Sequence, residues 1–146
     1  MGSLERTPAM RQATTLLRWG LAVLYLISGV LKLADPAAFA ESLDHYQLVP
    51  STLAYALSLY VPWMEVFAAS ALLVRRWQLA GWLLAILLGI GFSIFVTSAW
   101  IRGIDVSCGC FGASSQQPVG PLVVIRALAL TAAGAWGAWR TLSTHR

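Results

Sequence analysis

Charged residues are scarce in this sequence: only 11% of its 146 residues are Asp, Glu, Lys or Arg, whereas 58% are hydrophobic. A water-soluble domain needs about a quarter of its residues charged to coat its surface. The shortage of charge argues against an ordinary soluble domain and makes lipid the expected solvent. The net charge of +4 does not indicate a nucleic-acid partner, because the basic residues lie at the ends of apolar segments and form no cluster on one element.

Long apolar segments take the place of the missing charge. Four of them, over residues 16–33, 52–74, 79–100 and 122–139, approach the roughly 20 residues that cross a hydrocarbon core about 30 Å thick. The fold class expected is all-α, an integral membrane four-helix bundle that forms a single transmembrane domain over residues 1–146. Five tryptophans, which lie mostly near the segment ends, are typical of an interfacial aromatic belt: Trp19, Trp63, Trp77, Trp100 and Trp139.

The distribution of Lys and Arg predicts the orientation of the bundle. One side would carry Arg6, Arg11, Arg18, Arg75, Arg76, Arg140 and Arg146, and the other only Lys32 and Arg102. By the positive-inside rule both termini are cytoplasmic, and the loops 34–51 and 101–120 face the periplasm or exterior of a bacterial inner membrane. Asp35-Pro36 indicates a helix stop and a turn, so we expect no signal-peptide cleavage at residues 38–40.

Cysteine is almost absent, and the two cysteines present, Cys108 and Cys110, are separated only by Gly109 in the outward loop 101–120. A structural disulfide between them would contribute little, because closing so short a loop stabilises a fold by only about 1.6 kcal/mol, from which the strain of the ring must be subtracted. A strained, exposed disulfide is instead an exchangeable one. The stretch therefore favours a redox-active pair over metal or persulfide handling and over inert thiols.

A metal site is the alternative use of these thiols. Two thiolates make half of a tetrahedral zinc site, and the remaining ligands would have to come from Asp44, His45 or a partner. Soft thiolates suit Cu(I) better than zinc. A non-catalytic membrane scaffold or a Cu(I)-binding metallochaperone for periplasmic protein maturation is thus the rival to a thiol-disulfide exchange protein.

Three charged residues within the apolar segments are candidates for a buried role: Lys32, Glu65 and Arg126. An intramembrane carboxylate is costly unless it is protonated, paired or wetted, so Glu65 is expected to be functional or paired. Arg126 has a long side chain that can descend toward Glu65. A structural tie between these two and a role in proton or quinone chemistry are both open. For Lys32, snorkelling to the interface is favoured over catalysis.

Together these residues resemble the MauE/DoxX-like family of redox-associated four-helix membrane proteins, and its MauE side more closely. The resemblance runs from Arg18 to about Arg126 and is carried by "SGVLKLADPAAFA", "YQLVP", "PWMEV" and, most specifically, "CGCFG". It implies that Cys108 and Cys110 match the family's cysteine motif, and that Lys32, Glu65 and Arg126 match its recurring membrane charges.

The resemblance also implies a function for the cysteine pair. It indicates thiol-disulfide exchange with a periplasmic thioredoxin-like or disulfide-containing protein, with electrons passing to quinone or to a second membrane protein. Trp63, Trp100 and Phe111 are candidate walls of a cofactor site. MauE relatives are associated with maturation of a disulfide-rich subunit of methylamine dehydrogenase. A single cysteine pair, where quinone-linked disulfide oxidases carry two, points to a protein that works with partners.

Overall fold

A computed structural model describes residues 8–104 and 119–144 of the chain. Within these ranges the chain is helical and contains no strand: α1 (Pro8–Ala34), α2 (Pro36–His45), α3 (Ser51–Leu73), the short 3-10 turn η2 (Arg75–Trp77), α4 (Gln78–Ile101) and α5 (Pro121–Thr144). Helices α1, α3 and α5, and α4 together with η2, are long and apolar enough to cross a membrane. The predicted all-α membrane fold with four spanning helices is confirmed.

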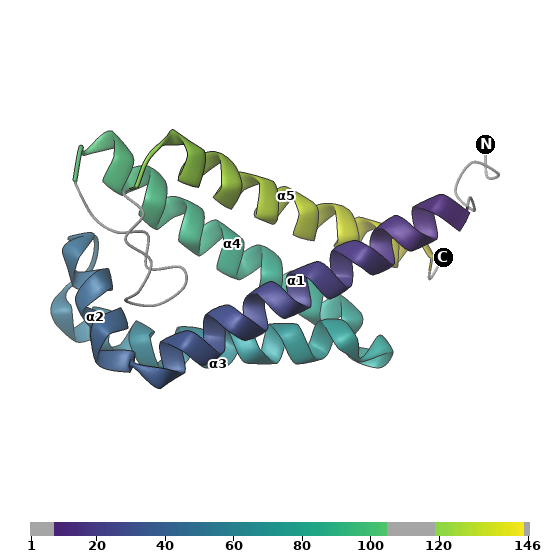
Figure 1. The fold of residues 1–146 in the computed structure, drawn as a ribbon, viewed down its shortest axis with the longest axis horizontal. Helices are drawn as coiled ribbons and strands as arrows, with labels where there is room; N and C mark the ends of the chain where they lie inside the picture. Colours follow the sequence, from purple (N-terminus) through teal and green to yellow (C-terminus); the bar gives the residue numbers. More distant parts are fainter. Residues whose placement is uncertain (1–7, 105–118, 145–146) are drawn as a thin grey trace.

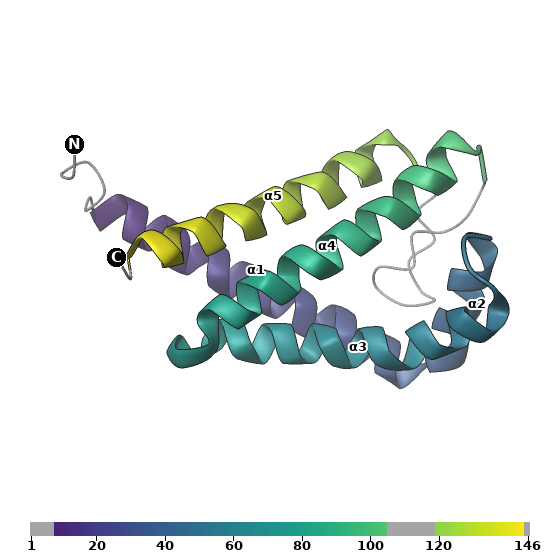
Figure 2. The same cartoon turned by 180° about the vertical axis from the view of Figure 1, so that it is seen from behind.

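The long helices form a four-membered bundle. Helix α1 packs on α3, α3 on α4 and α4 on α5, whereas α1 and α5 touch only slightly. The start of α1, the turn between α3 and α4 and the end of α5 lie at one end of the bundle (Figure 1). The opposite end holds α2, the end of α4 and the start of α5, as the view from behind also shows (Figure 2). The cytoplasmic placement of the termini stays a prediction.

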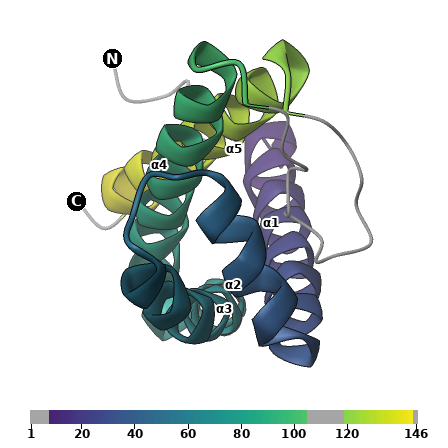
Figure 3. The ribbon, with the colours of Figure 1, turned by 90° about the vertical axis from the view of Figure 1, so that its left-hand side faces the viewer.

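The segment between the first two long helices is not the plain loop expected from residues 34–51, because it contains α2. Asp35 caps this helix, its side chain accepting a hydrogen bond of 3.0 Å from the backbone N–H of Ala38, and Pro36 occupies the first turn. Phe39 and Leu43, one turn apart, pack on Ala54 of α3. Viewed from this end, α2 lies in front of the ring of long helices (Figure 3).

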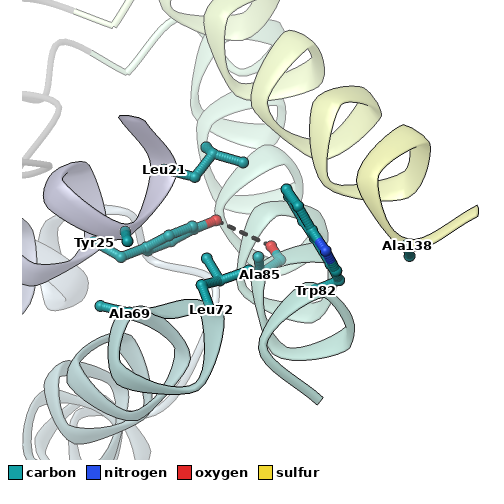
Figure 4. Close-up of a cluster of buried hydrophobic side chains, with 8 residues drawn as sticks. Leu21, Tyr25, Ala69, Leu72, Trp82, Ala85 and Ala138 are labelled. Atoms are coloured by element: carbon teal, nitrogen blue, oxygen red, sulfur yellow. Dashed lines mark hydrogen bonds between the residues drawn. The ribbon is translucent and has the colours of Figure 1, made fainter. Parts of the chain in front are cut away.

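The core near the other end of the bundle depends on close contact between helices. Trp82 of α4 is fully buried and packs with Leu72, Leu21 and Tyr25 (Figure 4). The hydroxyl of Tyr25 donates a hydrogen bond of 3.0 Å to the carbonyl of Ala85, which ties α1 to α4. Small residues permit such contacts where the hydrophobic effect between membrane helices is absent.

Candidate functional site

The central feature of the bundle is a cavity of about 170 Å³ near the end that holds α2. All five α-helices contribute residues to its walls, which are mostly apolar and aromatic. Phe39 comes from α2, and Phe92 and Phe95 come from α4. Val61, one turn before Glu65 on α3, also lines the cavity. The cavity thus resembles the ligand pockets found between the helices of bundles, with apolar walls and a few polar groups.

A close approach of α1 and α3 sets the position of the polar groups. A Cβ atom at Gly29 would lie 2.9 Å from the carbonyl oxygen of Pro62 and 3.2 Å from the Cβ of Glu65, so only glycine allows this distance. Lys32 lies one turn after Gly29, and Glu65 lies one turn after Pro62. Residues three apart share a helix face. The glycine contact therefore brings the ammonium and the carboxylate together inside the bundle.

Lys32 and Glu65 form a buried ion pair. The Nζ of Lys32 lies 2.5 Å from Oε1 of Glu65, and each side chain is only 7% exposed. Lys32 also donates a hydrogen bond of 3.0 Å to the Oγ of Ser28 and lies 4.9 Å from the centre of the Phe39 ring. The expectation that Lys32 snorkels is wrong, because α2 and α3 enclose it.

The partner of Glu65 also differs from the one expected. The sequence suggested a tie to Arg126, but the ion pair of Glu65 is with Lys32 of α1. Arg126 lies instead on the cavity wall contributed by α5. Of the described residues that line the cavity, it is the exposed one. The structure therefore brings all three predicted membrane charges to one cavity, although not in the predicted pairing.

One polar atom in this cavity is left without a partner. The Oε2 of Glu65 is buried, and no hydrogen-bond donor reaches it from the described part of the chain. A buried carboxylate oxygen that makes no hydrogen bond loses its hydration without compensation, which costs about 1–3 kcal/mol or more. Such an atom in a native structure points to strain, a function or a missing ligand.

The connection between α2 and α3 contributes Tyr46 to the lining of the cavity. Tyr46 is 3% exposed and packs edge-on against Phe95, with 5.7 Å between ring centres. Burial raises the pKa of Tyr46 from 10.0 to about 12. Its carbonyl accepts a hydrogen bond of 3.0 Å from Arg102, the basic residue nearest to the cysteines in sequence. Arg102 thus holds this connection against the end of α4.

The remaining predicted site residues lie elsewhere. Cys108, Cys110 and Phe111 fall outside the described residues. Trp63 is 55% exposed and Trp100 is 47% exposed, and neither belongs to the described lining of the cavity. Their role as cofactor walls stays a prediction. The sequence reasoning missed five aromatic residues of the lining: Tyr25, Phe39, Tyr46, Phe92 and Phe95. Their spacing along the sequence does not separate them from ordinary core residues.

Of the candidate metal ligands, the structure describes Asp44 and His45. His45 is exposed at the end of α2, and Asp44 accepts a hydrogen bond of 2.8 Å from Ser51 at the start of α3. Within residues 8–104 and 119–144 no group of three or more His, Cys, Asp or Glu side chains is placed to hold a metal ion. A Cu(I) site at the cysteines stays untested by this geometry.

The fold and its cavity define a small multi-pass helical membrane protein with a buried ion pair between its first two spanning helices. The model of one family, methylamine utilisation protein MauE, matches residues 10–140, so the chain belongs to the MauE family. It is 29% identical over 117 residues to methylamine utilization protein MauE of Paracoccus denitrificans, covering 80% of this chain and 63% of that protein. No solved structure matches the chain. The family and the four apolar helices make it a multi-pass bacterial membrane protein.

Proposed function

We propose that this protein exchanges disulfides through Cys108 and Cys110 with a soluble partner on the outer face of the membrane, within methylamine utilisation. The observation that carries the proposal is the placement of the only two cysteines one residue apart in the connection between α4 and α5. That connection leaves the bundle at the end that holds α2. The printed name of the relative from Paracoccus denitrificans supports the methylamine context.

The exchange needs nothing beyond two thiols and a disulfide. The thiolate of one cysteine attacks a sulfur of the partner's disulfide, which forms a mixed disulfide and releases one partner thiolate. The second cysteine then attacks the mixed bond, so that a Cys108–Cys110 disulfide forms and the partner leaves with two thiols. Two electrons pass from this chain to the partner. The reverse sequence oxidises a partner dithiol and reduces Cys108–Cys110.

The described ends of the connection support a site close to the cavity mouth. Ile104 and Val119 pack around Tyr46 and Ala99, and Tyr46 lines the cavity. Cys108 follows Ile104 by four residues, a stretch of chain that spans about 14 Å at most. The thiol pair is therefore tethered within reach of the outer end of the bundle, where a soluble partner has access.

Single Cys108→Ser and Cys110→Ser variants test the proposal in host cells grown on methylamine. A dithiol exchange requires both sulfurs, so each variant should lose function. One of them should accumulate a mixed disulfide with the partner, seen as a higher-mass band on a non-reducing gel that dithiothreitol removes. Ser107→Ala is the matched control, because it changes the adjacent side chain and keeps both thiols.

Two results would contradict the exchange. Full function of either single cysteine variant means that no two-thiol relay operates. Stoichiometric copper in the purified protein, lost in both cysteine variants, with no mixed disulfide in either, would assign the pair to the rival function of a Cu(I)-binding scaffold.

A further inference from the structure

We infer that the cavity between α1, α3, α4 and α5 binds a lipid-soluble ring of the hydroquinone class, with a ring hydroxyl donating to the Oε2 of Glu65. This inference goes beyond the proposed function, since binding in the cavity requires neither cysteine. It rests on the volume and lining of the cavity, on the ion pair of Lys32 with Glu65 and on the unpartnered carboxylate oxygen.

The volume of the cavity fits one substituted ring. At about 170 Å³ it slightly exceeds the engineered protein cavity of about 150 Å³ that binds benzene. Phe39, Phe92 and Phe95 give it aromatic walls, and aromatic side chains pack favourably on a flat ring in offset or edge-on geometry. Most of the lining belongs to helices that are long and apolar enough to cross a membrane, so a ligand that dissolves in lipid can reach the protein.

The polar groups of the cavity specify oxygen substituents on that ring. The Oε2 of Glu65 is a buried acceptor with no donor among the described residues, so it calls for a ligand O–H. The ammonium of Lys32 already donates to Glu65 and to Ser28, and an ammonium carries a third N–H that can meet a ligand oxygen. A hydroquinone offers both a hydroxyl donor and an oxygen acceptor on one neutral ring.

Neutrality of the ligand follows from the charges already present. Lys32 and Glu65 neutralise each other within the bundle. A second buried ion would add a desolvation cost that this pair does not compensate. A neutral ring that carries hydroxyl groups meets this requirement.

Binding of trimethylhydroquinone to the purified full-length protein in lipid nanodiscs, measured by isothermal titration calorimetry, tests the inference. The dimethyl ether of the same compound keeps the ring and both oxygens but has no O–H. We expect saturable binding of the hydroquinone and about ten- to hundredfold weaker binding of the ether, the ratio expected for loss of one charge-assisted hydrogen bond.

Two pairs of variants locate the ligand. Val61→Phe places a ring inside the cavity and should abolish binding, whereas Val23→Phe makes the same change at a residue of α1 that is 50% exposed and does not line the cavity. Glu65→Gln replaces one carboxylate oxygen by an N–H donor, so it should erase the preference for the hydroquinone over the ether. Circular dichroism verifies that each variant is helical.

Several results would overturn the inference. Undiminished binding to Val61→Phe places the ligand outside the cavity. Equal affinity for the hydroquinone and its ether in the native protein removes the role of Glu65 Oε2. Uptake that does not saturate, and is the same in all variants, means partition into lipid only. Loss of disulfide exchange in the cysteine variants leaves this binding test unchanged, so the two proposals fail separately.

Discussion

The buried ion pair between Lys32 and Glu65 gives a quantitative prediction for stability. Removing one partner leaves the other charge buried and uncompensated, which costs about 3–5 kcal/mol in protein interiors. We expect losses of this size for Lys32→Met and for Glu65→Leu, because each side chain is only 7% exposed. Replacing both by apolar residues of similar length removes both desolvation costs, so the double variant should recover most of the loss.

A double-mutant cycle measures this coupling. Unfolding of the native protein, the two single variants and the double variant by sodium dodecyl sulfate in mixed micelles, followed by circular dichroism, gives the four free energies. The coupling should reach about 3 kcal/mol. Ser28→Ala is the control: it removes one hydrogen bond of Lys32 and should cost about 1 kcal/mol. Strict additivity of the two single variants would refute the pairing.

Three further changes test other parts of the structure. Gly137→Ala should destabilise the bundle by about 1–3 kcal/mol, because its Cβ would lie 2.5 Å from the ring of Trp82. Gly20→Ala is the control and should not destabilise the bundle, because Gly20 has open space around it. Equal effects of the two substitutions would contradict the packing of Trp82 on Gly137. Asp35→Ala should lower the free energy of unfolding by about 0.5–2 kcal/mol, because it removes the N-cap hydrogen bond of α2. An unchanged free energy of unfolding would argue against that cap. The pKa of Tyr46 is about 12 in the folded protein and 10.0 when unfolded, so the contribution of Tyr46 to stability should be complete below pH 10 and decline as the pH rises through 12. An ultraviolet titration of the native protein, compared with Tyr46→Phe, measures this pKa. A midpoint near 10 would contradict the burial of Tyr46.

Hydropathy predicted the spanning helices well, because the need to avoid unpaired backbone groups in lipid leaves few alternatives to an apolar helix. The starts of α3, α4 and α5 each lie one residue before the predicted limit. Helix α1 starts at Pro8, well before residue 16, and α5 runs past residue 139 to Thr144. These extensions are polar and leave no hydropathy signal, since a helix that emerges from lipid can continue in water.

Helix α2 was missed because the pair Asp35-Pro36 at its start has two structural interpretations. Asp followed by Pro ends a preceding helix, and this was the interpretation adopted. The same pair can also begin a helix, with Asp as the N-cap and Pro at the first helical position. In this protein Asp35 and Pro36 begin α2 in this way. Phe39 and Leu43 are four residues apart, and both are buried against α3. This spacing was the available signal for a short amphipathic helix.

The polar residues of the cavity were identified from the sequence, but their pairing was not. Lys32, Glu65 and Arg126 are conspicuous because charge is rare in apolar segments. Their mutual distances depend on the register of α1 against α3, which is set where Gly29 meets the backbone of Pro62. Contacts between residues 33 positions apart are a property of packing, and helix periodicity alone does not encode them.

The thiol pair is the centre of the proposed function, and its reduction potential is the most direct measurement. The purified protein in detergent is equilibrated against a series of glutathione buffers, and the thiols of Cys108 and Cys110 are counted by alkylation and mass shift. A reversible two-electron midpoint between about −270 and −120 mV, the range of thiol-disulfide catalysts, is the predicted result. Thiols that stay reduced across the series, or that bound metal protects from alkylation, would contradict the exchange function.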